Sequence, residues 1–283
     1  MTPTQFAEAL YSPLADRLVL TLAHFLWQGT LIAIVVLACG AICGRNVQRR
    51  YVVSVFGLLA LVILPLATFA ILGEQDAGNA FASSTNDVAL SDHIEGYDGL
   101  LRPSHETGSA VFDNPGRPSY EGGFLSSASP WLLVTWLAGV LILSLRLVLA
   151  VASASWLKRT GDIAGEMLRG QTERLSRKLH SRTPIVRVSR QVTQAMAVGF
   201  FRPVIIIPTA WLIQLPPECL EAVLAHELAH IRRRDLWINL MQRIVETFLF
   251  FHPAVWWLSA RLRHEREMCC DELAVSLTGR RVE

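Results

Sequence analysis

Three long apolar runs constrain the fold of this chain more than any other feature of its sequence. They cover about residues 18–43, 51–72 and 131–154, and each is nearly free of charged side chains. A helix needs about 20 apolar residues to cross a hydrocarbon core of about 30 Å, so each run is long enough to do so. The composition agrees, since 52% of the 283 residues are hydrophobic and only 18% are charged. The sequence therefore predicts a mainly α membrane protein with three transmembrane helices.

Basic residues between and after the runs indicate how the chain is oriented. Arg45, Arg49 and Arg50 lie in the short connector between the first two runs. Because arginine and lysine mark the cytoplasmic side of a membrane, we expect the N-terminus outside and the region after the third run inside. That region is rich in lysine and arginine, which the same bias explains better than nucleic-acid binding. No direct nucleic-acid partner is expected.

The segment between the second and third runs differs in composition from both. Residues 73–129 are rich in Gly, Ser, Asn and Asp and carry nine acidic and two basic side chains. No apolar periodicity runs through them, which is typical of a segment that cannot bury a core. The sequence predicts a membrane domain over 1–154, in which 73–129 form an acidic, flexible extracytoplasmic loop. A cytoplasmic domain is expected over 155–283.

Residues 226–230 read His-Glu-Leu-Ala-His, and their context predicts a helix that starts near Pro217. Two histidines four positions apart lie about 40° apart around a helix, so both imidazoles can bind one zinc ion. Glu227 would then lie beside the metal, where it can accept a proton from water. The pattern arises by chance in roughly one chain in a hundred of this length. The alternative is an amphipathic helix with two histidines packed in a core.

A catalytic zinc site takes a third protein ligand and leaves its fourth position open. Glu267 and Asp271 lie four positions apart on a second predicted helix. One of these carboxylates can bind zinc while the other orients a ligating histidine through its free N–H. Taken alone, such a pair is a common feature of a solvated helix face.

Together these motifs resemble the BlaR/MecR-type family of integral-membrane gluzincin metallopeptidases, peptidase family M-56. The resemblance rests on residues 226–230, on Phe-His-Pro-Ala-Val-Trp-Trp at 251–257 and on Glu-Arg-Glu-Met-Cys-Cys-Asp-Glu at 265–272. Residues 197–208 resemble the strand region ahead of the zinc helix in that family, and the resemblance covers about residues 180–275.

The resemblance implies a gluzincin-like zinc metallopeptidase domain with a small β-sheet, on the inner face of a bacterial cytoplasmic membrane. It implies His226, His230 and Glu267 as zinc ligands. Glu227 is implied as the general base, and Asp271 as the carboxylate that orients a ligand histidine. The implied activity is zinc-dependent endopeptidase action in signal transduction, by cleavage of the protein itself or of a cytoplasmic transcriptional repressor, as in inducible β-lactam resistance.

The sequence departs from the receptor pattern at its end. It stops at Glu283 without another span or a penicillin-binding sensor domain, so either it is truncated or this member senses something else. Two other functions remain open: a protease that processes membrane proteins, and a non-catalytic receptor or scaffold that keeps the motif only for packing. The expected partners are a protein or peptide substrate and the lipid bilayer.

The apolar run over residues 236–258 looks like a fourth span, but the zinc ligands argue against a crossing. A full crossing would put Glu267 about 30 Å from the two histidines, whereas zinc ligands lie about 2 Å from the metal. The sequence therefore predicts a membrane-proximal helical hairpin over about 236–272 that turns at residues 250–253, where Pro253 starts the second helix. Packing on the membrane and packing in a soluble core both fit it. His252 is expected to be a cap or an interface residue.

Two further expectations concern strands and cysteines. Residues 185–188 and 204–207 are expected to be short strands, and Ile206 is placed on an edge strand that could hold an extended peptide. Cys269 and Cys270 point about 100° apart on a helix, so both cannot share the face of Glu267. They are expected to be buried packing residues.

Overall fold

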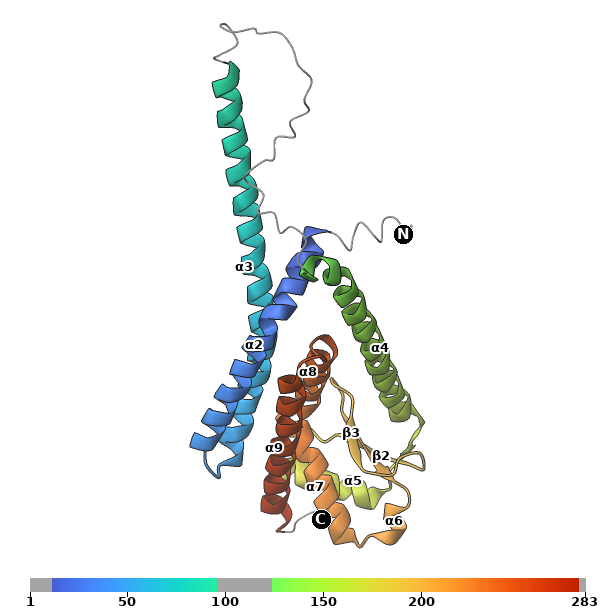
Figure 1. The fold of residues 1–283 in the computed structure, drawn as a ribbon. Coiled ribbons are helices and arrows are strands. Elements are labelled where there is room, and N and C mark those ends of the chain that lie inside the picture. The colour runs from blue at the N-terminus through green and yellow to red at the C-terminus, as the bar shows by residue number, and fades with distance from the viewer. Residues whose placement is uncertain (1–11, 96–123, 280–283) are drawn as a thin grey trace, which may run out of the picture. The chain divides into compact units, whose positions relative to one another are not determined.

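The computed structural model describes residues 12–95 and 124–279, which form a largely helical chain with one small sheet (Figure 1). The helices are α2 (Pro13–Ile42), α3 (Val47–Glu95), α4 (Phe124–Thr160), α5 (Glu166–Lys178), α6 (Trp211–Gln214), α7 (Pro217–Arg233), α8 (Asp235–Phe248) and α9 (Pro253–Thr278). The strands are β1 (Asp162–Ile163), β2 (Ile185–Ser189), β3 (Met196–Val198) and β4 (Val204–Pro208). The predicted fold class, a mainly α protein with a small sheet, is confirmed.

The chain forms two compact units, and each contains parts of the long helices. The first consists of the chain up to Phe25 together with Ile63–Trp136. Within it, the guanidinium of Arg17 on α2 donates hydrogen bonds to the carbonyl of Phe69 on α3. The second consists of Leu26–Val62 and of the chain from Leu137 onward, and it holds the sheet and α5 to α9.

Three of the described helices are long and apolar enough to cross a membrane. The spans are Leu14–Ile42, Val47–Gln75 and Pro130–Thr160, one on each of α2, α3 and α4. They contain the three predicted runs almost entirely and extend most of their ends by several residues. Helices that expose this much apolar surface are suited to the interior of a membrane, because contact between apolar side chains and water is unfavourable.

The structure differs from the sequence-based prediction over the start of the acidic segment. The loop expected from residue 73 is wrong for residues 73–95, because α3 continues as a helix to Glu95, and α4 begins at Phe124. A helix that is already nucleated adds one hydrogen bond for each further residue, and residues 73–95 contain no proline to stop it. The rest of the expected loop, residues 96–123, lies outside the described residues.

The sheet has the order β1-β2-β4-β3 and mixes parallel and antiparallel pairs. β2 and β4 are parallel, and β3 runs antiparallel to β4 with Ala197 opposite Ile205. The expectation that Ile206 lies on an edge strand is therefore wrong. β4 pairs on both sides and is completely buried, because the chain makes edge strand β3 first and then inserts β4 between β3 and β2.

The core of the second unit joins the sheet to the helices that follow it. One face of the sheet packs its buried β2 and β4 side chains against α5 and α7. On α7 this contact uses Leu220, Leu224 and Leu228, all at most 1% exposed. The spacing of these leucines fixes which face of α7 points away from the sheet, and α9 lies there (Figure 1).

The chain turns between α8 and α9 where the sequence analysis places the break. α8 ends at Phe248 and α9 begins at Pro253, although α9 continues to Thr278 rather than to about residue 272. The expectation that His252 caps a helix is confirmed. Its Nδ1 accepts the N–H of Ala254 and caps α9, while its Nε2 lies 2.9 Å from the carbonyl oxygen of Leu26 on α2.

Candidate metal centre

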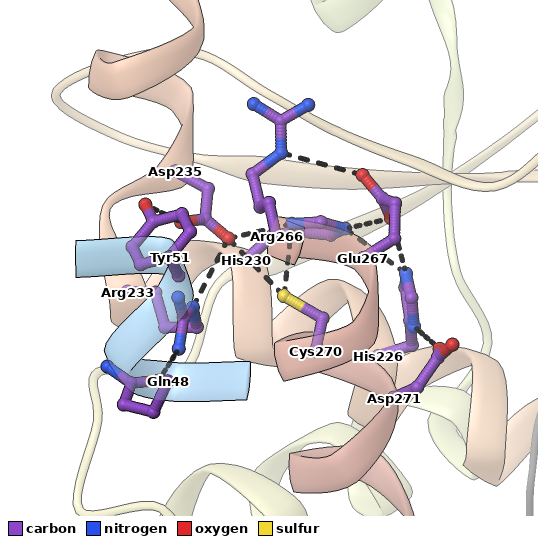
Figure 2. Close-up of polar contacts among 10 residues, drawn as sticks. All are labelled: Gln48, Tyr51, His226, His230, Arg233, Asp235, Arg266, Glu267, Cys270 and Asp271. Carbon is purple, nitrogen blue, oxygen red and sulfur yellow. Dashed lines mark hydrogen bonds and ion pairs between the residues drawn. The ribbon is translucent and has the colours of Figure 1, made fainter. Parts of the chain in front are cut away.

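The open face of α7 and the facing side of α9 bring three potential ligand atoms together (Figure 2). The two Nε2 atoms of His226 and His230, one helical turn apart on α7, are 3.1 Å from each other. Glu267 reaches over from α9, and its Oε2 lies 3.4 Å from each of these nitrogens. The structure thus brings together the three ligands that the resemblance implies, although they come from two helices.

The spacing of these atoms fits a metal ion. Ligands of a tetrahedral zinc ion, at about 2.0–2.1 Å from the metal, lie about 3.3 Å from one another. The triangle formed by His226, His230 and Glu267 has sides of 3.1, 3.4 and 3.4 Å. Two imidazole nitrogens and one carboxylate oxygen are also donors that zinc accepts. The residues present therefore fit a zinc ion with one position left open.

The other ring nitrogen of each histidine lies beside a carboxylate. His226 Nδ1 is 2.9 Å from Asp271 Oδ1, and His230 Nδ1 is 3.0 Å from Asp235 Oδ2. The first contact has the distance of an ion pair without the geometry of a straight hydrogen bond. A proton held at both Nδ1 atoms leaves both Nε2 lone pairs for the metal, which is the usual arrangement of histidine ligands. The structure thus pairs Asp271 with His226.

Asp235 is a residue of the site that was not expected from the sequence. This aspartate is the first residue of α8 and is 3% exposed, and its Oδ2 accepts hydrogen bonds from His230 and, at 3.3 Å, from the Cys270 thiol. Arg234 brings it there, because its left-handed conformation (φ 59°) ends α7 and starts α8 in one step. A position five residues after His230 would otherwise point about 140° away around a continuing helix.

Cys270 also has a more specific place than the expected packing role. Both Cys269 and Cys270 are buried, as expected, but Cys270 Sγ lies 3.3 Å from His230 Nδ1. Burial raises the pKa of the Cys270 thiol to about 11, so it remains protonated and can donate to Asp235. His230, Asp235 and Cys270 are also close enough to hold a metal, yet their hydrogen bonds already satisfy one another.

The electrostatic field at the site favours positive charge. Burial alone would lower the pKa of His230, but its hydrogen bonds to Asp235, Cys270 and Glu267 outweigh burial and raise that pKa to about 12. Burial would raise the pKa of Glu267, but hydrogen bonds with His226 and His230 outweigh it and lower the pKa. A cluster of side chains that attracts a proton this strongly also attracts a metal cation.

Glu227 lies close to the three candidate ligands and is almost out of contact with solvent. It follows His226 directly on α7, and the residue is 8% exposed. Burial raises the pKa of Glu227, while the histidines and the backbone N–H of Ala197 on β3 act in the opposite direction. The hydrogen bond from Ala197 ties this carboxylate to the edge strand of the sheet.

One side of the centre is open to solvent. The side chains of Glu267 and Asp271 are 47% and 38% exposed, against 16% for His230. Arg266 lies 3.5 Å from Glu267 Oε1, and this ion pair leaves Oε2 directed at the histidines. The arrangement can hold a metal on one side and admit a substrate from the other.

The fold and this donor set define a class of protein: a helical chain with three candidate membrane spans, in which two packed helices carry the donor set of a metallopeptidase. The family model described as BlaR1 peptidase M56 matches residues 31–282. The chain belongs to this family.

Curated relatives agree with the family but are considerably longer. The regulatory protein BlaR1 of Bacillus licheniformis is 24% identical over 239 residues, which cover 80% of this chain and 37% of that protein. The methicillin resistance mecR1 protein of Staphylococcus aureus is 23% identical over 92 residues, 32% of this chain and 16% of the relative. The BlaR1 of Staphylococcus aureus is 19% identical over 144 residues, 50% and 25% of the two chains. This chain thus spans well under half the length of each relative.

Proposed function

We propose that this chain is a membrane-anchored, zinc-dependent endopeptidase that acts in signalling. His226, His230 and Glu267 would bind the zinc, with Glu227 as general base. One observation carries this proposal: three donor atoms form a triangle with the dimensions of a zinc site, and both histidines present Nε2 because a carboxylate lies at each Nδ1.

The roles of the residues follow from their positions. When bound, zinc supplies Lewis acidity that polarises the scissile carbonyl and makes a water molecule more acidic. Glu227 accepts the proton of that water on its carboxylate and later delivers it to the leaving amine. The N–H of Ala197 holds the carboxylate in place for both transfers. Asp235 and Asp271 keep the imidazoles in the tautomer that presents Nε2.

The substrate peptide would lie along β3. This strand is the edge of the sheet beside α7, and Ala197 on it contacts the proposed general base. An exposed edge can pair with an extended peptide through main-chain hydrogen bonds. A cavity of about 780 Å³ adjoins β3 between α4 and α8, with mainly apolar walls and with Arg146 and Lys158 among its lining residues. It favours a substrate with apolar side chains near the cleaved bond.

The membrane setting and the family support a regulatory role. We place the N-terminus outside and the peptidase at the cytoplasmic face, because Arg45, Arg49 and Arg50 follow the first span. Two relatives carry the name regulatory protein. The proposed substrate is the protein itself or a cytoplasmic transcriptional repressor. The region from residue 155 to the end would form the peptidase domain, and residues 1–154 the membrane domain.

Metal analysis and proteolysis of the purified full chain test the proposal together. Glu227→Gln should keep about one zinc ion per chain and lose cleavage of a peptide substrate by at least about 100-fold, because the base is gone while the ligands remain. His226→Ala should lose both zinc and cleavage.

Matched variants separate these effects from damage to the fold. Glu221→Gln changes another acid of α7, and His264→Ala changes an exposed histidine of α9, so both should behave like the wild type. Undiminished cleavage by Glu227→Gln would refute the assigned base. A wild-type protein that binds no zinc would refute the proposed activity altogether.

A further inference from the structure

The start of α3 contacts the junction between α7 and α8, on the Asp235 side of the candidate metal centre (Figure 2). The hydroxyl of Tyr51 donates to Asp235 Oδ1 at 3.2 Å. Gln48 accepts a hydrogen bond of 2.9 Å from Arg233, whose guanidinium lies 4.5 Å above the ring of Tyr51. Three side-chain contacts thus join a candidate membrane span to the end of the helix that carries both histidines.

The same stretch of α3 also holds α9, which carries Glu267. Ser54 donates to Glu265 Oε2 at 2.5 Å, and Arg50 lies 3.3 Å from Glu265 Oε1. Both Ser54 and Glu265 are fully buried. Gly57 allows close packing of α3 on two helices, since a Cβ there would lie 2.6 Å from Val36 of α2 and 3.2 Å from Leu258 of α9. α3 therefore contacts the end of α7 and the middle of α9, the two helices that carry the three candidate ligands.

We propose that Tyr51 is a positioning residue of the metal centre, which fixes Asp235 and through it the ligand His230. Docked in this way, α3 links a candidate membrane span to the geometry of the site. The proposal rests on the proposed zinc-peptidase function and names the element of the membrane domain that controls it.

The contacts of Asp235 show why Tyr51 has this role. Among the described residues, three side chains contact its Oδ2 atom: His230 through Nδ1 at 3.0 Å, Cys270 through Sγ at 3.3 Å and Arg233 through Nε at 3.6 Å. Its Oδ1 atom accepts a hydrogen bond from the Tyr51 hydroxyl. A carboxylate held at both oxygens cannot rotate, whereas one held at a single oxygen can turn about its Cβ–Cγ bond and take its hydrogen bond to His230 out of line.

Solvent cannot readily replace the hydroxyl. Tyr51 is 8% exposed and Asp235 is 3% exposed, so removal of the hydroxyl takes from the buried Oδ1 the side-chain donor that it has in the described part of the chain. α3 is also the helix of the candidate span Val47–Gln75. A displacement of that span would lengthen the contact between Tyr51 and Asp235 before it reached the metal ligands, so α3 can switch the site between an ordered and a loosened form.

A double-mutant cycle on the full chain in detergent tests this pathway. The variants are Tyr51→Phe, which removes only the hydroxyl, Asp235→Asn, and the two combined. The measurements are the zinc dissociation constant by chelator competition and the visible spectrum of the cobalt(II)-loaded protein, which reports ligand geometry. We expect Tyr51→Phe to weaken zinc binding about tenfold and to shift the cobalt spectrum, but to change nothing further in the Asp235→Asn background.

Ser153→Ala is the matched control, because it removes one hydroxyl from candidate span α4, and that hydroxyl donates to the carbonyl of Ala150 in its own helix. It should leave both readouts unchanged. Gln48→Ala is a second, milder variant at an exposed position of α3, and it should weaken zinc binding in the same direction by about threefold.

Two results would overturn the proposal. Wild-type zinc affinity and an unshifted cobalt spectrum in Tyr51→Phe would show that the hydroxyl does not position the site. Equal effects of Tyr51→Phe with and without Asp235 would show that it does not act through that carboxylate. In either case a wild-type chain that binds zinc leaves the proposed function standing, while a wild type that binds neither metal ends both proposals.

Discussion

Each of the two histidines of the candidate centre has a carboxylate beside its Nδ1, but the two carboxylates lie in very different surroundings. His226 is held by Asp271 on α9, whose side chain is 38% exposed. His230 is held by Asp235 at the start of α8, which is 3% exposed and also contacts Tyr51, Cys270 and Arg233. One side of the site is a solvent-exposed pair, and the other is a buried network.

This difference indicates which side fixes the site and which side can adapt. Water can satisfy the outer oxygen of an exposed carboxylate, so a substitution there disturbs few contacts within the protein. A buried carboxylate has no such substitute, and its loss leaves several donors without an acceptor. We infer that the Asp235 side fixes the geometry, while the Asp271 side borders the open face where a substrate would arrive.

The largest effect is expected from Asp235→Asn. The amide has one acceptor oxygen where the carboxylate has two, so its NH2 group must face a donor, either His230 or the Tyr51 hydroxyl, and Arg233 loses its counter-charge. We expect zinc affinity to fall about 100-fold, at the upper end for a residue that orients a metal ligand. Chelator competition measures it, and the melting temperature of the metal-free protein shows whether the fold is retained.

A smaller effect is expected from Asp271→Asn. His226 Nδ1 itself is buried, but the amide can still turn its oxygen toward that nitrogen and its NH2 group toward solvent, so zinc affinity should fall about tenfold or less. The same competition assay measures both variants side by side. A loss as large as that of Asp235→Asn would break the comparison, because exposure would then make no difference to the two carboxylates.

Local patterns in the sequence were sufficient to predict the candidate site residues on α7 and α9. His226, Glu227 and His230 follow from helical spacing, and Glu267 with Asp271 repeats that spacing on a second helix. The helix break before Pro253 followed from the short length of zinc bonds. Each of these inferences needs only residues within one turn of a helix, or a constraint on how far two helices can separate.

The contacts of Asp235 could not be predicted in this way, because they depend on conformations that no local pattern specifies. Asp235 reaches His230 only because Arg234, which is not glycine, adopts a left-handed conformation. Tyr51 contacts Asp235 from 184 positions away. The place of Ile206 was wrong for a related reason: β3 has three residues, too few to show periodicity, so its insertion at the edge beyond β4 was not visible.

The smallest effect is expected from Cys270→Ala, and it tests how finely the buried network is balanced. A thiol is a weak donor, and Asp235 keeps its contacts with Tyr51 and His230 when Cys270 is lost. Zinc affinity should therefore fall only about threefold, far less than for Asp235→Asn. Cys219→Ala, at an exposed cysteine, controls for the loss of a thiol as such. A loss of 100-fold in Cys270→Ala would mean that its sulfur is itself a metal ligand, and the ligand set of two histidines and Glu267 would have to be revised.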